Sequence, residues 1–197
     1  MGVKLAAASG GSIELVPTNT ASNFTVTVPA GTGTIAVQGV STNIASGTAV
    51  ASTSGTSIDF TSIPAWVKRI TVMFSGVSLS GTSNYLVQLG AGSVTTSGYI
   101  SAGGIYVAGT TAILSSTAGF VIRNSTAASN VTSGSMVITN ISSNNWLSTH
   151  TFGDVPSAAT GSGGGNIALG GTLDRVRLTT VNGTDTFDAG SVNILFE

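Results

Sequence analysis

The sequence contains no cysteine, and its 197 residues include one histidine, His150. Without cysteine the chain has no disulfides, no thiolate metal ligands and no cysteine nucleophile, so its stability must come from packing or from association of chains. A Ser-His-acid triad would have to use His150. These absences narrow the catalytic chemistry that is possible for this chain.

Charge is also scarce. Charged residues make up 7% of the chain and the net charge is -1, whereas soluble proteins average about 25% charged residues. The six lysines and arginines form no cluster, and because a phosphate backbone requires clustered positive charge, no nucleic-acid partner is expected. No apolar run reaches the roughly 20 residues of a membrane span or the roughly 7 to 15 of an export signal, so we expect neither membrane insertion nor export by the general route.

What the chain does contain is short runs in which apolar and other residues alternate. Ile70, Val72 and Phe74 are one such set, with the period of two that is typical of a half-buried strand. No window of helical length keeps a three-four apolar spacing without glycine or β-branched residues, so helix should be nearly absent. The chain is therefore predicted to be all-β.

The first 37 residues predict a small module. They hold three strand candidates, residues 12–16, 24–28 and 33–37, separated by turns that contain proline and glycine. Three strands of about five residues have one thin apolar face, which is marginally stable alone in water. We therefore expect a three-stranded meander that is completed by sister chains in a homotrimer.

Residues 38–47 are predicted to be a linker, and residues 48–197 a β-sandwich of jelly-roll type, because many short strands follow one another without helices. A shift of the apolar phase at Ser75-Gly76 predicts a β-bulge. The Gly- and Ser-rich stretches 91–97, 124–133 and 153–165 are expected to be connections. The strand candidates are 48–53, 57–60, 68–79, 84–90, 98–107, 118–123, 134–141, 145–152, 166–180 and 190–196.

The residues that could support catalysis have simpler interpretations. The strand 145–152 places His150 on one face with Trp146, Ser148 and Phe152, which favours packing or a trimer contact over general-base catalysis. Asp185 and Asp188 lie in a segment rich in Asn, Asp and Gly, which favours a turn over a catalytic acid pair or a calcium loop.

The glycine run 161–166 lacks the Lys-Ser/Thr of a phosphate-binding loop and is predicted to be a flexible loop. No catalytic, cofactor-binding or metal-binding residue is assigned. The chain is predicted not to be an enzyme and to need no cofactor.

Exposed aromatic residues would be a better sign of function, because tyrosine and tryptophan stack on sugars and anchor interfaces. The candidates for receptor or interface contacts are Tyr85, Tyr99, Tyr106, Trp146 and the neighbouring His150, with burial in the core as the alternative for each. Trp66, at a strand entrance, is instead expected in the core or as an end cap of the sandwich.

Three stretches resemble structural proteins of tailed bacteriophages. Residues 9–37, with Ser9-Gly-Gly-Ser-Ile-Glu-Leu-Val-Pro17 and Phe24-Thr-Val-Thr-Val-Pro29, resemble a short module found repeatedly in fibre proteins. Residues 58–90, which begin Ile58-Asp-Phe-Thr-Ser-Ile-Pro-Ala-Trp66, and residues 174–197, which end Val192-Asn-Ile-Leu-Phe-Glu197, are similar to the carboxyl-terminal domain of phage tail and fibre proteins. Residues 91–170 are not covered.

The resemblance implies a virion structural protein that works as a homotrimer, with residues 1–37 as its amino-terminal attachment and trimerisation module. It would be assembled in the host cytoplasm, bound to other capsid or tail proteins and exposed on the particle surface. The leading expectation is a short fibre on the tail or the head whose sandwich contacts a host surface glycan. Two alternatives stay open: a capsid decoration or cement protein with a purely architectural role, and a polysaccharide depolymerase spike, for which no acid pair or triad can be assembled.

Overall fold

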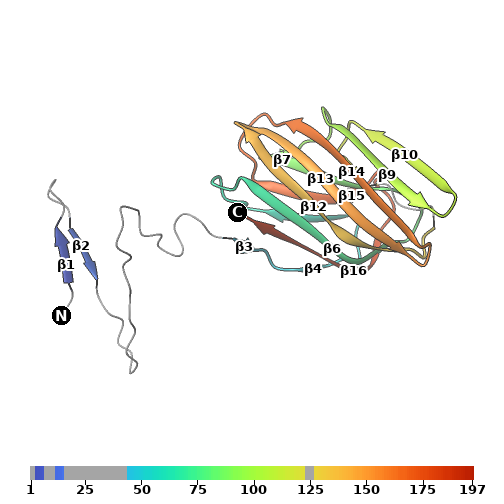
Figure 1. Cartoon of the computed structure of the whole chain (residues 1–197), viewed down its shortest axis with the longest axis horizontal. Helices are drawn as coiled ribbons and strands as arrows, with labels where there is room; N and C mark the ends of the chain where they lie inside the picture. Colours follow the sequence, from blue (N-terminus) through green and yellow to red (C-terminus); the bar gives the residue numbers. More distant parts are fainter. Residues whose placement is uncertain (1–2, 7–11, 16–43, 123–126) are drawn as a thin grey trace, which may run out of the picture. The chain divides into compact units, whose positions relative to one another are not determined.

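The computed structural model describes residues 3–6, 12–15, 44–122 and 127–197, and the chain divides into two units, Met1–Ala36 and Val37–Glu197 (Figure 1). In the first unit β1 (Val3–Ala6) and β2 (Ser12–Leu15) pair antiparallel. β2 matches a predicted strand, whereas β1 is not among the predicted ones. The predicted strands 24–28 and 33–37 lie outside the described residues.

The described part of the second unit contains no helix, which confirms the all-β prediction for these residues. It also holds no helix that is long and apolar enough to cross a membrane. Its strands are β3 (Ala45–Ser46), β4 (Val50–Ala51), β5 (Ser57–Thr61), β6 (Arg69–Leu79), β7 (Tyr85–Ala91), β8 (Ser93–Val94), β9 (Ile100–Val107), β10 (Thr110–Ser116), β11 (Phe120–Ile122), β12 (Val131–Ser142), β13 (Asn145–Val155), β14 (Ala159–Ala168), β15 (Arg175–Thr180) and β16 (Phe187–Phe196).

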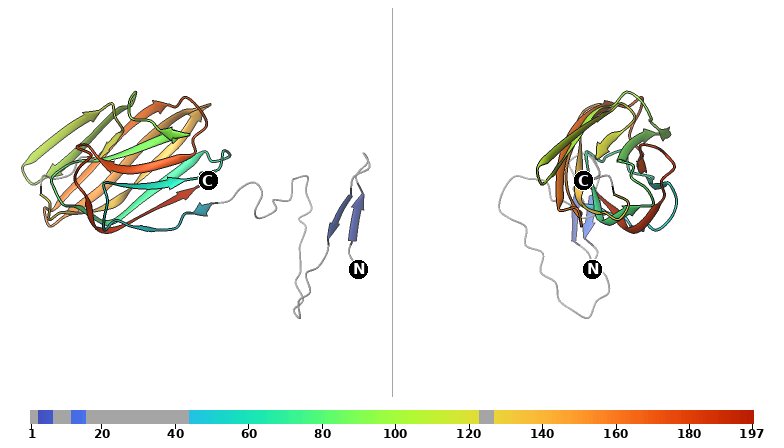
Figure 2. Two further views of the ribbon diagram at one scale, coloured as in Figure 1. Left: turned by 180° about the vertical axis from the view of Figure 1, so that it is seen from behind. Right: turned by 90° about the vertical axis from the view of Figure 1, so that its right-hand side faces the viewer.

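These strands form two antiparallel sheets that pack face to face, as the end-on view of Figure 2 shows. The larger, nine-stranded sheet has the order β10-β9-β14-β13-β12-β6-β16-β3, with β4 also beside β16. The smaller, five-stranded sheet has the order β11-β7-β15-β5, with β8 also beside β7. A sandwich of two antiparallel sheets is therefore confirmed.

The core lies between the sheets and follows from the alternation in the sequence. Along β13 every second residue is buried, from Trp146 to Asp154, and the residues between them are exposed. Ile70 and Val72 of β6 face the smaller sheet, where Leu178 of β15 is equally buried. Since burying a large apolar side chain stabilises a fold by about 1.5 to 3 kcal/mol, this shared interior fixes which face of each strand points inward.

The predicted bulge on β6 is confirmed. Two residues of β6, Ser75 and Gly76, lie opposite the single residue Ser133 of β12. Gly76 has a φ of 62°, and its N–H donates a 2.9 Å hydrogen bond to the Ser133 hydroxyl. The extra residue shifts the phase of the strand, so that Phe74 before it and Val77 after it both face the core.

Several predicted boundaries are wrong. Residues 153–165 are not a long connection: β13 runs to Val155 and β14 begins at Ala159. Residues 166–180 are not one strand, because β14 and β15 belong to different sheets. The last residues of the predicted linker form β3, which pairs with the end of β16.

Candidate functional site

Most of the predicted contact residues are buried in the sandwich. Tyr85, Tyr99, Trp146 and His150 belong to its interior, whereas Tyr106 is 52% exposed. A receptor contact needs an accessible side chain. For the first four residues the surface interpretation is therefore corrected to a packing role, and Tyr106 alone of the five is placed to touch a partner.

Two buried tyrosines have structural partners for their hydroxyl groups. The Tyr85 hydroxyl donates to the carbonyl oxygen of Val77 at 3.1 Å, and the Tyr99 hydroxyl accepts the backbone N–H of Leu89 at 2.7 Å. The Tyr99 ring also packs edge-on against Phe120, with 5.0 Å between ring centroids. Burial raises the pKa of each tyrosine to about 12, so both side chains stay neutral at pH 7. Through these contacts they hold the two sheets in place.

His150 is a packed residue rather than a base. Its ring stacks on Phe152, with 6.1 Å between centroids, and neither ring nitrogen has a hydrogen-bond partner among the described residues. Burial lowers its pKa to about 4, so the ring is neutral at pH 7. The Ser148 hydroxyl on the same face also makes no hydrogen bond within the described ranges. Ser148 and His150 therefore do not form a nucleophile-base pair.

The glycine run 161–166 is strand, not a flexible loop. A Cβ atom on Gly161 would lie 2.2 Å from the Phe152 ring, and one on Gly163 would lie 2.4 Å from the His150 ring. The rings of β13 therefore lie over the bare backbone of β14. The sequence does carry a signal for this arrangement, since Gly161, Gly163 and Gly165 alternate with the period of a strand.

Of the two acids predicted to lie in a turn, Asp185 does, whereas Asp188 is part of strand β16. The Asp185 carboxylate accepts hydrogen bonds from the Ser83 N–H at 2.9 Å and from the Asn182 side-chain amide at 2.7 Å. Asp188 instead accepts a hydrogen bond from the Ser78 hydroxyl on β6. No group of three or more His, Cys, Asp or Glu side chains in the described part of the chain could hold a metal ion.

The most distinctive surface is the outward side of the larger sheet. Strands β9, β10, β12, β13 and β14 contain no Lys, Arg or Glu, and their two ionisable groups other than tyrosine, His150 and Asp154, point into the core. We call the outward-facing residues of these five strands the uncharged face. It consists of Ser, Thr, Gly, Asn and Ala, together with a few large exposed side chains that include Ile100, Tyr106, Ile113 and Leu147.

The large side chains gather at opposite ends of this face. Ile100 of β9 and Leu147 of β13 both pair with Asn166 of β14, and so lie on either side of it. Tyr106 lies at the other end, because it is six residues further along β9, where it pairs with Thr111 of β10. Ile113 is two residues from Thr111 along β10 and pairs with Gly104. At roughly 3.4 Å per residue the two ends are about 20 Å apart. Between them the outward residues of β9 and β14 are small: alanine, serine and glycine.

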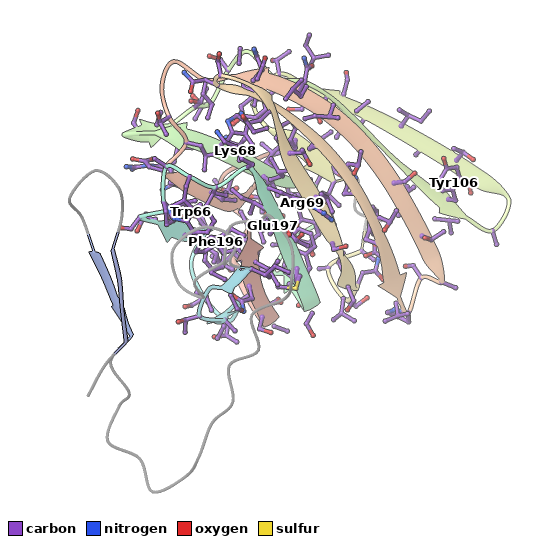
Figure 3. All side chains as sticks on the ribbon, turned by 60° about the vertical axis from the view of Figure 1, so that its left-hand side comes forward. Trp66, Lys68, Arg69, Tyr106, Phe196 and Glu197 are labelled. Carbon is purple, nitrogen blue, oxygen red and sulfur yellow. The ribbon has the colours of Figure 1, made fainter. Side chains whose placement is uncertain are left out.

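Charge is placed elsewhere on the sandwich. On the smaller sheet the Arg177 guanidinium holds both carboxylate oxygens of Asp59, at 2.7 and 3.0 Å. At one end of the sandwich, Arg69 pairs with Glu197 at 3.1 Å. Figure 3 shows this pair beside Trp66, and Tyr106 at the far end. The uncharged face is therefore a local property and not a consequence of overall composition alone.

Trp66 is not a core residue. It is 50% exposed, and its ring lies 5.9 Å from that of Phe196, in a tilted arrangement. It thus covers the end of the last strand, as expected for an end cap, and leaves one side of its ring accessible.

No family model, curated protein or solved structure matches the chain. The resemblance to phage fibre proteins stays a prediction. The feature of the chain that points to a function is the uncharged face. A sequence signal for that surface exists, because no charged residue occurs between Arg69 and Arg123, and only Asp154 between Arg123 and Asp174.

Proposed function

We propose that the chain is a non-enzymatic structural subunit of a bacteriophage particle, a short trimeric fibre whose sandwich contacts the host cell through the uncharged face. The proposed contact surface is supported by one observation: a broad sheet face has no charge and has an exposed tyrosine at one end. The virion role is supported by the resemblance of residues 9–37, 58–90 and 174–197. In this proposal the first unit docks on the tail or head and forms the trimer, and the sandwich has jelly-roll connectivity.

The chemistry of the face favours a neutral glycan. Serine, threonine and asparagine side chains offer hydrogen bonds to sugar hydroxyls, and the ring of Tyr106 offers a stacking surface. A surface without charge cannot form an ion pair with a phosphate or carboxylate group. Binding should therefore change little with ionic strength, in contrast to charge-steered adsorption.

Non-enzymatic action is supported by what the candidate catalytic groups do instead. His150 is buried against Phe152, and Asp185 is bound to Ser83 and Asn182. Each group is used for folding, which favours recognition without bond cleavage.

Two equally exposed aromatic residues at opposite ends allow a matched test. We expect Tyr106→Ala to weaken binding of the purified protein to a neutral bacterial surface polysaccharide about tenfold, the effect of losing roughly 1.4 kcal/mol. Trp66→Ala should leave it unchanged. Binding is measured by surface plasmon resonance over a panel of neutral and acidic polysaccharides. Loss with Trp66→Ala and not with Tyr106→Ala would place the contact at the wrong end of the molecule.

A decoration or cement protein is the second candidate, because a flat uncharged sheet face also suits packing against another protein. Electron microscopy of intact particles separates the two. A fibre leaves the uncharged face open to solvent, and a cement protein buries it against the capsid. Absence of the protein from purified particles would remove both.

A further inference from the structure

Strand β10 forms an outer edge of the larger sheet (Figure 1). It pairs with β9 over seven consecutive residue pairs, Thr110 with Val107 through Ser116 with Ser101, without a register shift. No strand of the described residues pairs with its other side. A regular edge of this kind presents a row of backbone N–H and C=O groups that a further strand can use.

The other edges of the sandwich are blunted, and β10 is not. At the opposite edge of the larger sheet, β3 and β4 have two residues each. In the smaller sheet β8 has two residues and β11 three, while β5 carries Asp59 in its ion pair with Arg177. β10 has seven residues and contains no charge, no proline and no bulge. It therefore has none of the short length, charge, proline or bulge by which proteins commonly protect an edge.

The sequence of β10 is also complementary to itself. Thr110-Thr-Ala-Ile-Leu-Ser-Ser116 has two small hydroxyl residues at each end and three apolar residues in the middle. An antiparallel copy centred on Ile113 would place like with like: Thr110 opposite Ser116, Thr111 opposite Ser115, Ala112 opposite Leu114, and Ile113 opposite itself. Matched pairs of this kind stabilise antiparallel sheets, whereas like charges opposite each other would prevent the pairing.

We propose that β10 pairs antiparallel with β10 of a second copy of this chain, about a twofold axis at Ile113. The pairing joins two larger sheets into one continuous sheet. It closes on itself, so it consumes both edges and leaves none for further growth.

The side chains on both faces of β10 gain from this pairing. Ile113 is 75% exposed and would meet its counterpart, with Tyr106 of each copy close by on the same face. On the inner side Leu114 is half-buried and would be covered by Ala112 of the other copy. The pairing depends on β10 alone, so it is independent of the proposed virion role and of the trimer attributed to the first unit.

Because the full chain has no cysteine, single cysteines report the register directly. Ile113→Cys should give a covalent dimer on mild oxidation or with a short bis-maleimide. Thr111→Cys alone and Ser115→Cys alone should not, because position 111 lies opposite 115 and about 13 Å from its own counterpart. A mixture of these two variants should cross-link. Ile100→Cys, on the same face but not at the edge, is the matched control.

Three results would overturn the proposal: no dimer with Ile113→Cys, equal cross-linking of Ile100→Cys, or cross-linking of Thr111→Cys with itself. A second measurement needs no cross-link. Ile113→Lys places two positive charges opposite each other, so it should halve the mass of the assembly in sedimentation velocity relative to the unmodified chain. An unchanged thermal melt would show that the variant is folded, and an unchanged mass in the folded variant would count against the pairing.

Discussion

Acid should destabilise this fold through His150. The buried ring has a pKa of about 4, compared with about 6.5 in an unfolded chain. Between these two values the unfolded chain binds a proton that the folded chain excludes. The contribution of His150 to stability is therefore fully present above pH 6.5, declines as the pH falls, and is lost below pH 4.

The size of the effect follows from the shift. A difference of about 2.5 units, at 1.36 kcal/mol each, corresponds to about 3 kcal/mol in the free energy of unfolding. Because marginal stability is only about 5 to 15 kcal/mol for a typical domain, the loss should be plain in a denaturation curve. The cause is burial alone, since neither ring nitrogen has a hydrogen-bond partner among the described residues.

The measurement is urea unfolding at pH 7, 6, 5 and 4, at one fixed protein concentration, for the unmodified chain and for His150→Leu. The variant removes the titrating group and fits the same apolar surroundings, so it should be at least as stable at pH 4 as the unmodified chain. The difference between the two chains should change by about 3 kcal/mol between pH 7 and pH 4. Parallel pH profiles would refute the reasoning, because they would mean that His150 accepts a proton without leaving the core.

Two further outcomes follow from packing and a third from the lack of charge. Gly161→Ala should destabilise the fold by about 1 to 3 kcal/mol, because its Cβ would lie 2.2 Å from the Phe152 ring. Gly153→Ala should cost much less, because its Cβ would lie 3.9 Å from the nearest atom, the carbonyl oxygen of Ala159; urea unfolding compares the two variants. Phe196→Ala should cost about 2 kcal/mol, less than a fully buried phenylalanine, since the ring is only partly buried; an unchanged melting temperature would contradict this. Raising NaCl should leave polysaccharide binding by the uncharged face nearly constant, and a steep fall in affinity would reveal a charged contact instead.

Period-two alternation in the sequence predicts strands where one face is buried. It succeeds for β13 and for the first half of β6, where every second residue is buried. It fails for β10, where no residue is fully buried and the alternation has little amplitude. Alternation also does not show which of the two faces of a strand points inward. From the sequence, Trp146 and His150 are therefore equally good candidates for the surface and for the core, and only packing against the second sheet decides between them.

The glycine run of β14 is wrongly predicted as a loop from its composition, for a different reason. Glycine-rich segments usually form loops, because glycine is costly to order and contributes no packing. Here the neighbouring strands provide what β14 lacks: Phe152 and His150 reach across from β13, and β9 pairs on the other side. Such a strand is defined by contacts distant in sequence, and local propensity cannot anticipate it.

The pairing of β3 with β16 has a consequence for how the sandwich can be moved between proteins. Ala45, at the start of the sandwich, pairs with Phe196, near its end, so the first and last strands of the sandwich are neighbours. A domain whose ends meet can be inserted, exchanged or fused at a single place without stretching its strands. A cargo protein attached after Glu197 would sit beside the Trp66 end, and the Tyr106 end would stay clear of it.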